Sequence, residues 1–315
     1  MTDPSGGFVI GVDAGGTKTL ALLAAPDGTL IGRGAAGPGN YQSAGADAAL
    51  AALEAAISAA VDSAGKVAGA KDFAIAALCL GMAGVDRPED RAWISTWAQR
   101  RFPNTQLRIA NDAQLVLAAG TPENTGIAVI SGTGSMVYAA GAQGISARAG
   151  GWGYLLGDEG SGYAVGLAGM RAVVRAHDGR GPSTLLTGLL LAHFGLSDAS
   201  GLVGIVYRSG LTRPEIAWLS ILVDVAAQQN DPAALEIFAQ AADELALAAR
   251  AAAARLSLDQ PIPCALAGGG FTKGKTLLAA FSESVRRGGP LLEPVQLVAE
   301  PALGAVKIAL GMIDR

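Results

Sequence analysis

Two short glycine-rich segments hold the residue types best suited to bind an anion. Residues 13–19 follow the apolar run 8–12, and residues 131–135 follow the apolar run 126–130. Because glycine lacks a Cβ, the backbone N–H groups of such a turn can line a small concavity around phosphate oxygens. A single turn of this kind is as easily an ordinary β-turn, but its repetition favours phosphate binding by both turns. The residues predicted to contact phosphates are Gly15, Gly16, Thr17, Lys18, Gly132, Thr133 and Gly134.

Two aspartates stand where predicted strands end. Asp13 comes directly before the first glycine turn, where its carboxylate could hold Mg²⁺ through a water molecule. Asp112 follows the short segment 107–110 and precedes a predicted helix. It is either the N-cap of that helix, worth about 1 kcal/mol, or the base that accepts a proton from a hydroxyl group attacking a phosphate. Its position just before a predicted boundary between two lobes favours the catalytic role.

A third glycine run follows the apolar segment 262–267. Residues 269–276 fit the Walker A pattern of P-loop nucleotidases. Only residues 277–315 follow, with one clear strand, whereas a P-loop fold needs several further strand–helix units. We therefore predict a flat backbone surface for an adenosine, formed by Gly268, Gly269 and Gly270.

Three further side chains could contact a hydroxyl-rich ligand. Asp158, in the glycine-dense segment 150–162, either binds sugar hydroxyls or caps the helix that follows. Trp152 is either a core anchor or an apolar platform for a sugar ring. Asn40 either bonds a ligand amide or hydroxyl or shapes a turn.

The order of apolar runs and turns predicts alternating strands and helices. An opening of three strands joined by turns is followed by a helix over 44–64 with apolar residues at helical spacing. The strand and glycine-turn pattern returns at 126–140, which we interpret as an internal repeat that begins a second lobe near residue 118. The predicted strands are 8–12, 20–24, 30–35, 73–80, 107–110, 126–130, 136–140, 262–267 and 295–299, and the last helix is 301–310.

Composition and charge restrict the possible partners. The chain has 315 residues, 44 of them glycine, and a net charge of −4. Nucleic acid and anionic membranes favour a basic surface, so neither is expected as a partner. The sequence has neither a signal-like start nor an apolar run of membrane-spanning length, which favours a cytoplasmic location. Cys79 and Cys264 lie in apolar runs and are interpreted as buried core residues.

Taken together, these segments resemble the BadF/BadG/BcrA/BcrD-type ATPase family, which includes N-acetylglucosamine kinases, within the actin-like and sugar-kinase superfamily. The resemblance covers nearly the whole chain. It implies an α/β fold with two ribonuclease-H-like (actin-like ATPase) lobes and a central cleft, each lobe a mixed sheet flanked by helices. The first lobe is expected at 1–117, with a C-terminal helix at 301–315 packed on it, and the second at 118–300. The segments that carry the resemblance are 13–19, 81–85, 111–113, 131–135, 150–162 and 267–270.

The resemblance also implies an activity, namely transfer of a phosphoryl group from ATP, with Mg²⁺, to the 6-hydroxyl of an amino sugar. N-acetylglucosamine is the first expectation, with glucosamine, another hexose or a muramic derivative as alternatives, and a homodimer is expected. Asp112 would be the base, and the three glycine runs would hold the nucleotide. The residues that match sugar-site positions of the family are Asn40, Tyr41, Asp112, Gly151, Trp152, Gly153 and Asp158.

Two other functions found in the same superfamily fit this sequence less well. An activator ATPase drives electrons from an iron–sulfur cluster shared across a dimer, which requires exposed cysteines that Cys79 and Cys264 are not expected to provide. A sugar-responsive repressor would need a helix-turn-helix before Phe8, and the acidic charge argues against DNA binding.

Overall fold

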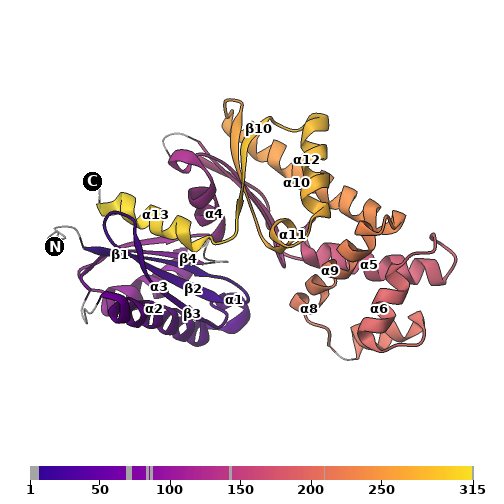
Figure 1. The fold of residues 1–315 in the computed structure, drawn as a ribbon, viewed down its shortest axis with the longest axis horizontal. Helices are drawn as coiled ribbons and strands as arrows, with labels where there is room; N and C mark the ends of the chain where they lie inside the picture. The colour runs from indigo at the N-terminus through magenta and orange to yellow at the C-terminus, as the bar shows by residue number, and fades with distance from the viewer. Residues whose placement is uncertain are drawn as a thin grey trace. The chain divides into compact units, whose positions relative to one another are not determined.

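The chain forms two compact units, each with its own sheet and core (Figure 1). The computed structural model describes residues 7–313 apart from 69–72, 83–84, 86–87, 142–143 and 209, so the centre of segment 81–85 lies outside the described residues. The first unit comprises Met1–Asn124 and Glu300–Arg315, and the second comprises Thr125–Ala299.

The first unit contains a five-stranded mixed sheet in the order β3-β2-β1-β4-β5. β1, β2 and β3 form an antiparallel meander, while β1, β4 and β5 pair in parallel. The two kinds of pairing follow from the connections, since short turns join the first three strands and helices join the others. The strands are β1 (Phe8–Ala14), β2 (Thr19–Ala24), β3 (Leu30–Ala36), β4 (Ile75–Met82) and β5 (Gln106–Ala110).

Side chains from β1 point alternately to the two faces of this sheet, and each face has its own core. Ile10 and Val12 belong to one core cluster, together with Leu53 and Ile57 of α2. Val9 belongs to the other, with Val306 of α13. The sheet therefore lies between two helical layers. The helices of this unit are α1 (Tyr41–Ala44), α2 (Ala46–Ala68), α3 (Pro88–Arg101), α4 (Asp112–Gly120) and α13 (Ala302–Ile313), with a 3-10 turn at Pro122–Asn124.

The second unit repeats this topology, with the strand order β10-β9-β6-β7-β8. β6, β7 and β8 are antiparallel, and β6, β9 and β10 are parallel. The strands are β6 (Gly126–Ser131), β7 (Ser135–Ala140), β8 (Ser146–Gly150), β9 (Ile262–Ala267) and β10 (Leu292–Val298). The sequence did not predict β8, because its short Ser-Ala-Arg-Ala-Gly segment lacks an apolar run.

Helices form most of the rest of the second unit. α10 packs on β7 and β8, and its buried alanines allow a close approach to the sheet. Two further 3-10 or single-turn elements are Ala199–Gly201 and α11 (Gly269–Thr272). The longer helices are α5 (Gly162–His177), α6 (Leu186–Phe194), α7 (Leu202–Tyr207), α8 (Arg213–Trp218), α9 (Ser220–Gln228), α10 (Pro232–Leu256) and α12 (Thr276–Gly288).

The fold class predicted from the sequence is confirmed, since each unit is a mixed sheet flanked by helices. The units divide between Asn124 and Thr125, later than the expected boundary at 117/118. The physical reason is α4, which runs on to Gly120 and packs against α13 in the first unit. A boundary at 117 would cut this helix.

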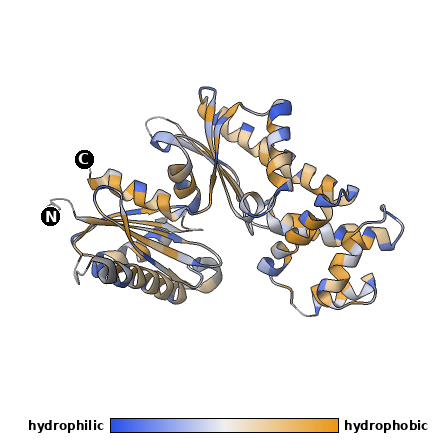
Figure 2. Cartoon of the chain, viewed as in Figure 1, coloured by the Kyte–Doolittle hydropathy of each residue, from blue (hydrophilic) through white to orange (hydrophobic). Residues whose placement is uncertain are grey.

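α2 is the helix whose composition most invites a membrane interpretation. Its segment Ala46–Gly65 has the length and apolar character of a membrane-spanning helix. In the structure α2 packs on β2 and β3, and Leu53 and Ile57 are buried in the core of the first unit. Figure 2 shows α13, on the opposite face of the sheet, coloured as hydrophobic over most of its length.

The contact between α13 and α4 generates a prediction about stability. A Cβ placed on Gly304 of α13 would lie 1.9 Å from the carbonyl oxygen of Leu115, whereas one placed on Gly311 of the same helix meets nothing within 4 Å. We expect Gly304→Ala to lower the free energy of unfolding by about 1–3 kcal/mol through overpacking. Gly311→Ala, the matched control, should raise it by about 0.5–1 kcal/mol because alanine favours helix. Urea unfolding of both variants checks this, and equal effects would contradict the close helix contact.

Candidate functional site

The first glycine turn joins β1 to β2 and is closed by one hydrogen bond, in which the Gly15 amide donates to the Lys18 carbonyl at 3.0 Å. Gly16, Thr17 and Lys18 are exposed. A Cβ on Gly16 would meet nothing within 4 Å, and Gly16 is not in the left-handed region of φ. The fold of the described chain therefore does not require glycine at this position, whereas a ligand that approaches the backbone closely would.

Residues 37–40 lie against this first turn. The amides of Gly39 and Asn40 both donate to the Gly15 carbonyl, at 3.0 and 3.2 Å. The Thr19 hydroxyl donates to the Gly37 carbonyl at 2.9 Å. Asn40 is thus held beside the predicted phosphate turn. The Tyr41 ring packs edge-on against Trp93, with 5.6 Å between centroids, so part of its surface serves the core.

Asp13 and Asp112 lie at the same edge of the first sheet. The register of the parallel strands aligns Asp13 with Gly81 and Gly81 with Ala110, so all three strands end together, and Asp112 follows β5. Burial and the nearby Asp112 carboxylate raise the pKa of Asp13 to about 7, while Lys18 acts in the opposite direction. The sheet therefore brings two mutually repelling carboxylates together beside the first glycine turn.

The helix-cap interpretation of Asp112 is wrong. Asn111 is the N-cap of α4, since its Oδ1 accepts from the Gln114 amide at 2.9 Å and Gln114 Oε1 accepts from the Asn111 amide. Asp112 is the first helical residue, and its Oδ1 accepts from the Ala113 amide at 2.9 Å. Asn111, and not Asp112, therefore caps α4.

The second glycine turn, between β6 and β7, is fastened to the segment before α5. The Ser131 hydroxyl donates to the Gly160 carbonyl at 2.7 Å, and the Ser135 hydroxyl donates to the Glu159 carbonyl at 2.6 Å. The Gly162 amide donates to the carbonyl of Gly132 at 2.8 Å. The predicted phosphate turn and segment 157–162 are therefore one connected structure in the second unit.

The third glycine run packs on the same turn. Gly268 has a φ of 92°, and a Cβ there would lie 2.2 Å from the Ser131 carbonyl oxygen. A Cβ on Gly270 would lie 2.5 Å from Ser131 Oγ. Glycine is thus needed at both positions for the β9–α11 connection to reach the second turn. The structure brings two of the three predicted nucleotide segments, 132–134 and 268–270, into contact.

The Walker A pattern at 269–276 does not form a P-loop. Residues 269–272 form α11, in which the Thr272 and Lys273 amides donate to the carbonyls of Gly268 and Gly269. The Thr276 amide donates to the buried Asp224 carboxylate at 3.1 Å. These N–H groups already have protein partners, so they cannot also cradle a phosphate as P-loop amides do.

Asp158 lies against the second turn with its side chain buried. The Ser135 amide donates to its Oδ1 at 3.3 Å, and Arg213 at the start of α8 donates to its Oδ2 at 3.3 Å. Burial raises the pKa of Asp158, and the Ser135 amide and Arg213 act in the opposite direction. The cap alternative for Asp158 is wrong, because Ser161 caps α5 by accepting from the Ala164 amide.

The segment that contains Trp152 forms the wall of a surface pocket. Gly150, Gly151 and Gly153 have φ values of 71°, 71° and 83°, a left-handed backbone that favours glycine. Trp152 is 65% exposed, so it is not a core anchor, and the Arg148 guanidinium lies 4.9 Å from its ring centroid.

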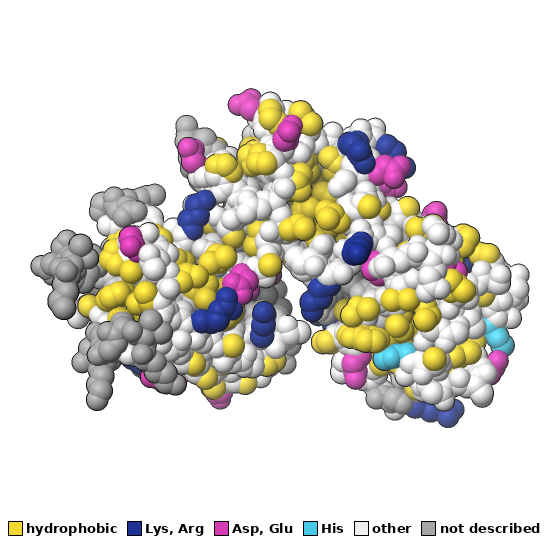
Figure 3. All heavy atoms as spheres, viewed as in Figure 1, with side chains coloured by type: hydrophobic (Ala, Val, Ile, Leu, Met, Phe, Trp, Pro, Cys, Tyr) yellow, Lys and Arg dark blue, Asp and Glu magenta, His cyan; other side chains and the backbone are white. Residues whose placement is uncertain are grey.

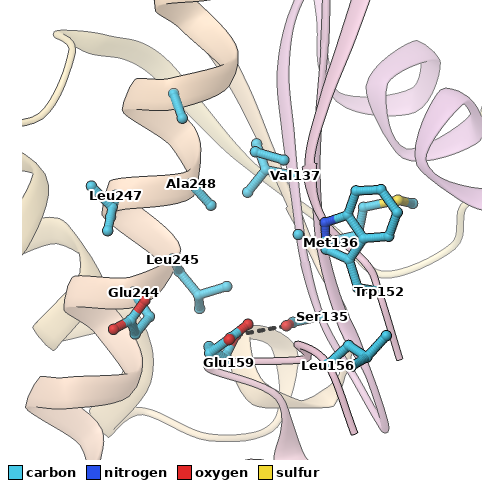
Figure 4. A pocket seen from close by; sticks show the side chains of 13 residues that line it. Ser135, Met136, Val137, Trp152, Leu156, Glu159, Glu244, Leu245, Leu247 and Ala248 are labelled. Atoms are coloured by element: carbon cyan, nitrogen blue, oxygen red, sulfur yellow. Dashed lines mark hydrogen bonds between the residues drawn. The ribbon is translucent and has the colours of Figure 1, made fainter. Parts of the chain in front are cut away.

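This pocket has a volume of about 230 Å³ and lies between α10 and the strands β7 and β8; we call it the α10 groove (Figure 4). Figure 4 shows Ser135, which follows the second turn, at one end of it, bonded to Glu159. The residues that line it are Ser135, Met136, Val137, Ala149, Gly150, Trp152, Leu156, Glu159, Glu244, Leu245, Leu247, Ala248 and Ala251.

The predicted site residues thus form two groups, one in each unit. The first unit holds Asp13, the first turn, Asn40 and Asp112, and the second unit holds the other two glycine runs, 151–153 and Asp158. Sequence reasoning missed Arg213, because it is distant in sequence from Asp158 and only the packing of α8 brings the two together.

Both cysteines lie in the core, as the sequence predicts. Cys79 and Cys264 are fully buried, and burial raises the pKa of each thiol to about 12. Within the part of the chain that the structure describes, no three His, Cys, Asp or Glu side chains cluster as metal ligands.

The sequence matches a family model and two named proteins over nearly its full length. Residues 10–309 match the model of the BadF/BadG/BcrA/BcrD ATPase family. The N-acetylmuramic acid/N-acetylglucosamine kinase of Clostridium acetobutylicum is 34% identical over 98% of this chain and 99% of its own length. The N-acetyl-D-glucosamine kinase of Dictyostelium discoideum is 32% identical over 96% of this chain and 97% of its own length.

Solved structures show the same architecture. A candidate N-acetylglucosamine kinase from Chromobacterium violaceum has a TM-score of 0.73 and 29% identity, covering 98% of this chain and all of its own. A ROK family glucokinase from Streptomyces griseus, crystallised with glucose and AMPPNP, has a TM-score of 0.58 at 22% identity. The match covers 96% of this chain and 98% of the glucokinase chain, so the two share the fold.

Proposed function

The chain belongs to the BadF/BadG/BcrA/BcrD ATPase family, and on that premise we propose that it transfers the γ-phosphate of ATP to the 6-hydroxyl of an amino sugar. The observation that carries this proposal is the pair of interacting carboxylates, Asp13 and Asp112, at one sheet edge beside an exposed glycine turn. Such a site combines a base, a metal-binding carboxylate and phosphate-binding amides, the elements that phosphoryl transfer to a hydroxyl requires.

Nucleotide binding is assigned to the three glycine runs. Support comes from Gly16 and Gly132, where neither backbone strain nor packing in the described chain requires glycine. Their amides would contact phosphates, while Gly268, Gly269 and Gly270 would border the adenosine. That the two turns hold one nucleotide stays a prediction.

Mg²⁺ fits the donor set around Asp13. This ion prefers oxygen ligands, keeps several waters and is usually bound through one or two carboxylates plus substrate phosphates. Asp13, beside a second carboxylate and the predicted phosphate turn, offers that chemistry. The ion, when bound, would neutralise charge on the β- and γ-phosphates.

Asp112 is proposed as the base that takes the proton from the attacking hydroxyl. Because Asn111 caps α4, this role of Asp112 does not compete with the helix cap. The glycine amides would stabilise negative charge that develops on the transferred group, and the bound geometry would align the hydroxyl with the phosphate.

The acceptor is proposed to be N-acetylglucosamine, with N-acetylmuramic acid, glucosamine or another hexose as alternatives. Support comes from the names of relatives, which are kinases of N-acetylmuramic acid, N-acetylglucosamine and, at 28% identity, glucosamine. The proposed sugar contacts are Asn40, Tyr41, Asp112, Gly151, Trp152, Gly153 and Asp158. The activator-ATPase alternative is disfavoured, because neither cysteine is exposed enough to ligate a shared cluster.

We further propose a cytoplasmic homodimer, with α10 at the interface. Leu155 and Leu156 are each 80% exposed and Leu247 is 51% exposed, and adjacent exposed apolar side chains mark contact surfaces. Figure 3 shows hydrophobic side chains gathered over the part of the second unit where α10 lies. Glu244 and Arg255 lie on one face of α10 about three turns apart, so a twofold-related copy would meet opposite charges.

ADP release in the presence of N-acetylglucosamine, N-acetylmuramic acid, glucosamine and glucose tests the function. We expect amino sugars to stimulate release, and Asp112→Asn to lower kcat by about 10²- to 10⁴-fold because the base is lost. Nucleotide affinity should change little. Asp47→Asn, an exposed aspartate in the first turn of α2, is the matched control. ADP release that no sugar stimulates, or full activity of Asp112→Asn, would remove the kinase assignment.

Gly16→Ala separates binding from folding. The thermal midpoint should stay at the wild-type value, since a Cβ at Gly16 has open space around it. Affinity for ATP should fall about tenfold or more, because the methyl group occupies the space of a phosphate oxygen and 1.4 kcal/mol suffices for this change. Calorimetric titration with ATP measures it. Unchanged affinity would exclude the first turn from the nucleotide site.

Leu156→Glu and Leu247→Glu test the dimer. Light scattering of the wild type should give about twice the chain mass of 31.5 kDa, and both variants should give the monomer mass. Leu30→Glu, which alters an exposed leucine of the first unit, should stay dimeric. A monomeric wild type would refute the interface.

A further inference from the structure

A buried carboxylate, that of Asp158, lies beside the second glycine turn, where the nucleotide phosphates are proposed to bind. The Asp158 side chain is only 6% exposed, and both its carboxylate oxygens lie 3.0–3.1 Å from the point where a Cβ on Gly134 would be. The proposed function, on which this inference rests, brings phosphate oxygens to the same turn. A buried negative charge within a few ångströms of an anion site weakens anion binding unless a cation compensates it.

Asp158 cannot easily withdraw from the turn. The neighbouring carbonyls of Glu159 and Gly160 accept hydrogen bonds from the hydroxyls of Ser135 and Ser131, which flank the turn. Asp158 itself has a φ of 62°, a region that few non-glycine residues occupy, so its surroundings hold it in place. The negative charge of Asp158 must therefore be compensated by a charge from elsewhere.

Arg213 supplies that charge from the start of α8. Its Nη2 lies 3.3 Å from Asp158 Oδ2, and its guanidinium lies 4.6 Å from the centroid of the Tyr154 ring. The start of α8 is fixed by a capping box in which Glu215 accepts from the amide and hydroxyl of Thr212. The ring contact and the capped helix hold the cation beside Asp158, although its side chain is 44% exposed.

We propose that Arg213 is a positioning residue for nucleotide binding, which neutralises Asp158 and so allows the turn at 132–134 to accept phosphate. It acts through Asp158, not by contact with the nucleotide. The proposal predicts that removal of the negative charge of Asp158 strengthens the binding of the anionic nucleotide.

A double-mutant cycle read by calorimetric titration with Mg²⁺ and AMPPNP, without sugar, tests this. Arg213→Gln should weaken binding about tenfold, the size expected for an uncompensated charge some 6 Å from a phosphate at intermediate dielectric. Asp158→Asn should bind about threefold more tightly than wild type. In the Asp158→Asn background, Arg213→Gln should weaken binding only about twofold, because no buried carboxylate remains to be neutralised.

Two controls separate charge from folding. Arg213→Lys keeps the cation but loses the planar contact with Tyr154, so it should restore affinity to within about threefold of wild type even if the thermal midpoint falls. Arg287→Gln breaks the exposed ion pair with Asp243 in the same unit and should leave affinity unchanged.

Three results would overturn the proposal. They are wild-type affinity in Arg213→Gln, an equal loss in the Asp158→Asn background, or weaker binding by Asp158→Asn, which would mean that the carboxylate attracts the metal ion. Because no acceptor is present, the cycle can succeed even if the amino-sugar assignment fails. Absence of binding by the wild type would refute both the nucleotide site and this role of Arg213.

Discussion

The parallel pairing of β1, β4 and β5 is the constraint on which the candidate chemistry depends. Parallel strands end at the same edge of a sheet, and the register here aligns Asp13, Gly81 and Ala110 in one row. Asp112 follows this row directly. Gly81 has no side chain because Leu115 of α4 fills that space, with a Cβ there only 2.0 Å from Leu115 Cδ2. The close packing of α4 on the sheet therefore positions the proposed base.

The second unit repeats this topology but surrounds its first turn with different contacts. Its first connection is again a glycine turn, but two serine hydroxyls fasten that turn to segment 157–162, and the β9–α11 glycines pack on it from the other side. Short polar side chains suit this role, since buried carbonyls at these positions would otherwise be left without donors. The repeated hairpin therefore has different neighbours in each unit, and the Asp158–Arg213 ion pair lies in the second unit.

Two motifs show why local sequence can mislead. Residues 269–276 satisfy the Walker A pattern, yet amides of this segment donate hydrogen bonds within α11 and to the Asp224 carboxylate. The position of Asp224 depends in turn on the packing of α9. Asn111 and Asp112 are adjacent and both suit an N-cap, but only Asn111 makes the capping box with Gln114. In the first case Asp224, which is distant in sequence, takes one of the amides, and in the second the adjacent Asn111 takes the cap.

The sequence by itself predicted alternating strands and helices, the repeated hairpin and the glycine runs, because apolar periodicity and glycine turns act over a few residues, whereas the actin-like fold class was implied by the family resemblance. It missed β8, whose small side chains give no strand pattern, and it ended the first lobe too early, because the extent of α4 depends on its contact with α13. Only the tertiary structure decided that Trp152 is exposed, that Asp158 lies against the second turn and that Arg213 forms an ion pair with Asp158. These are contacts between residues far apart in the chain, and burial, charge compensation and hydrogen-bond partners exist only once the elements have packed.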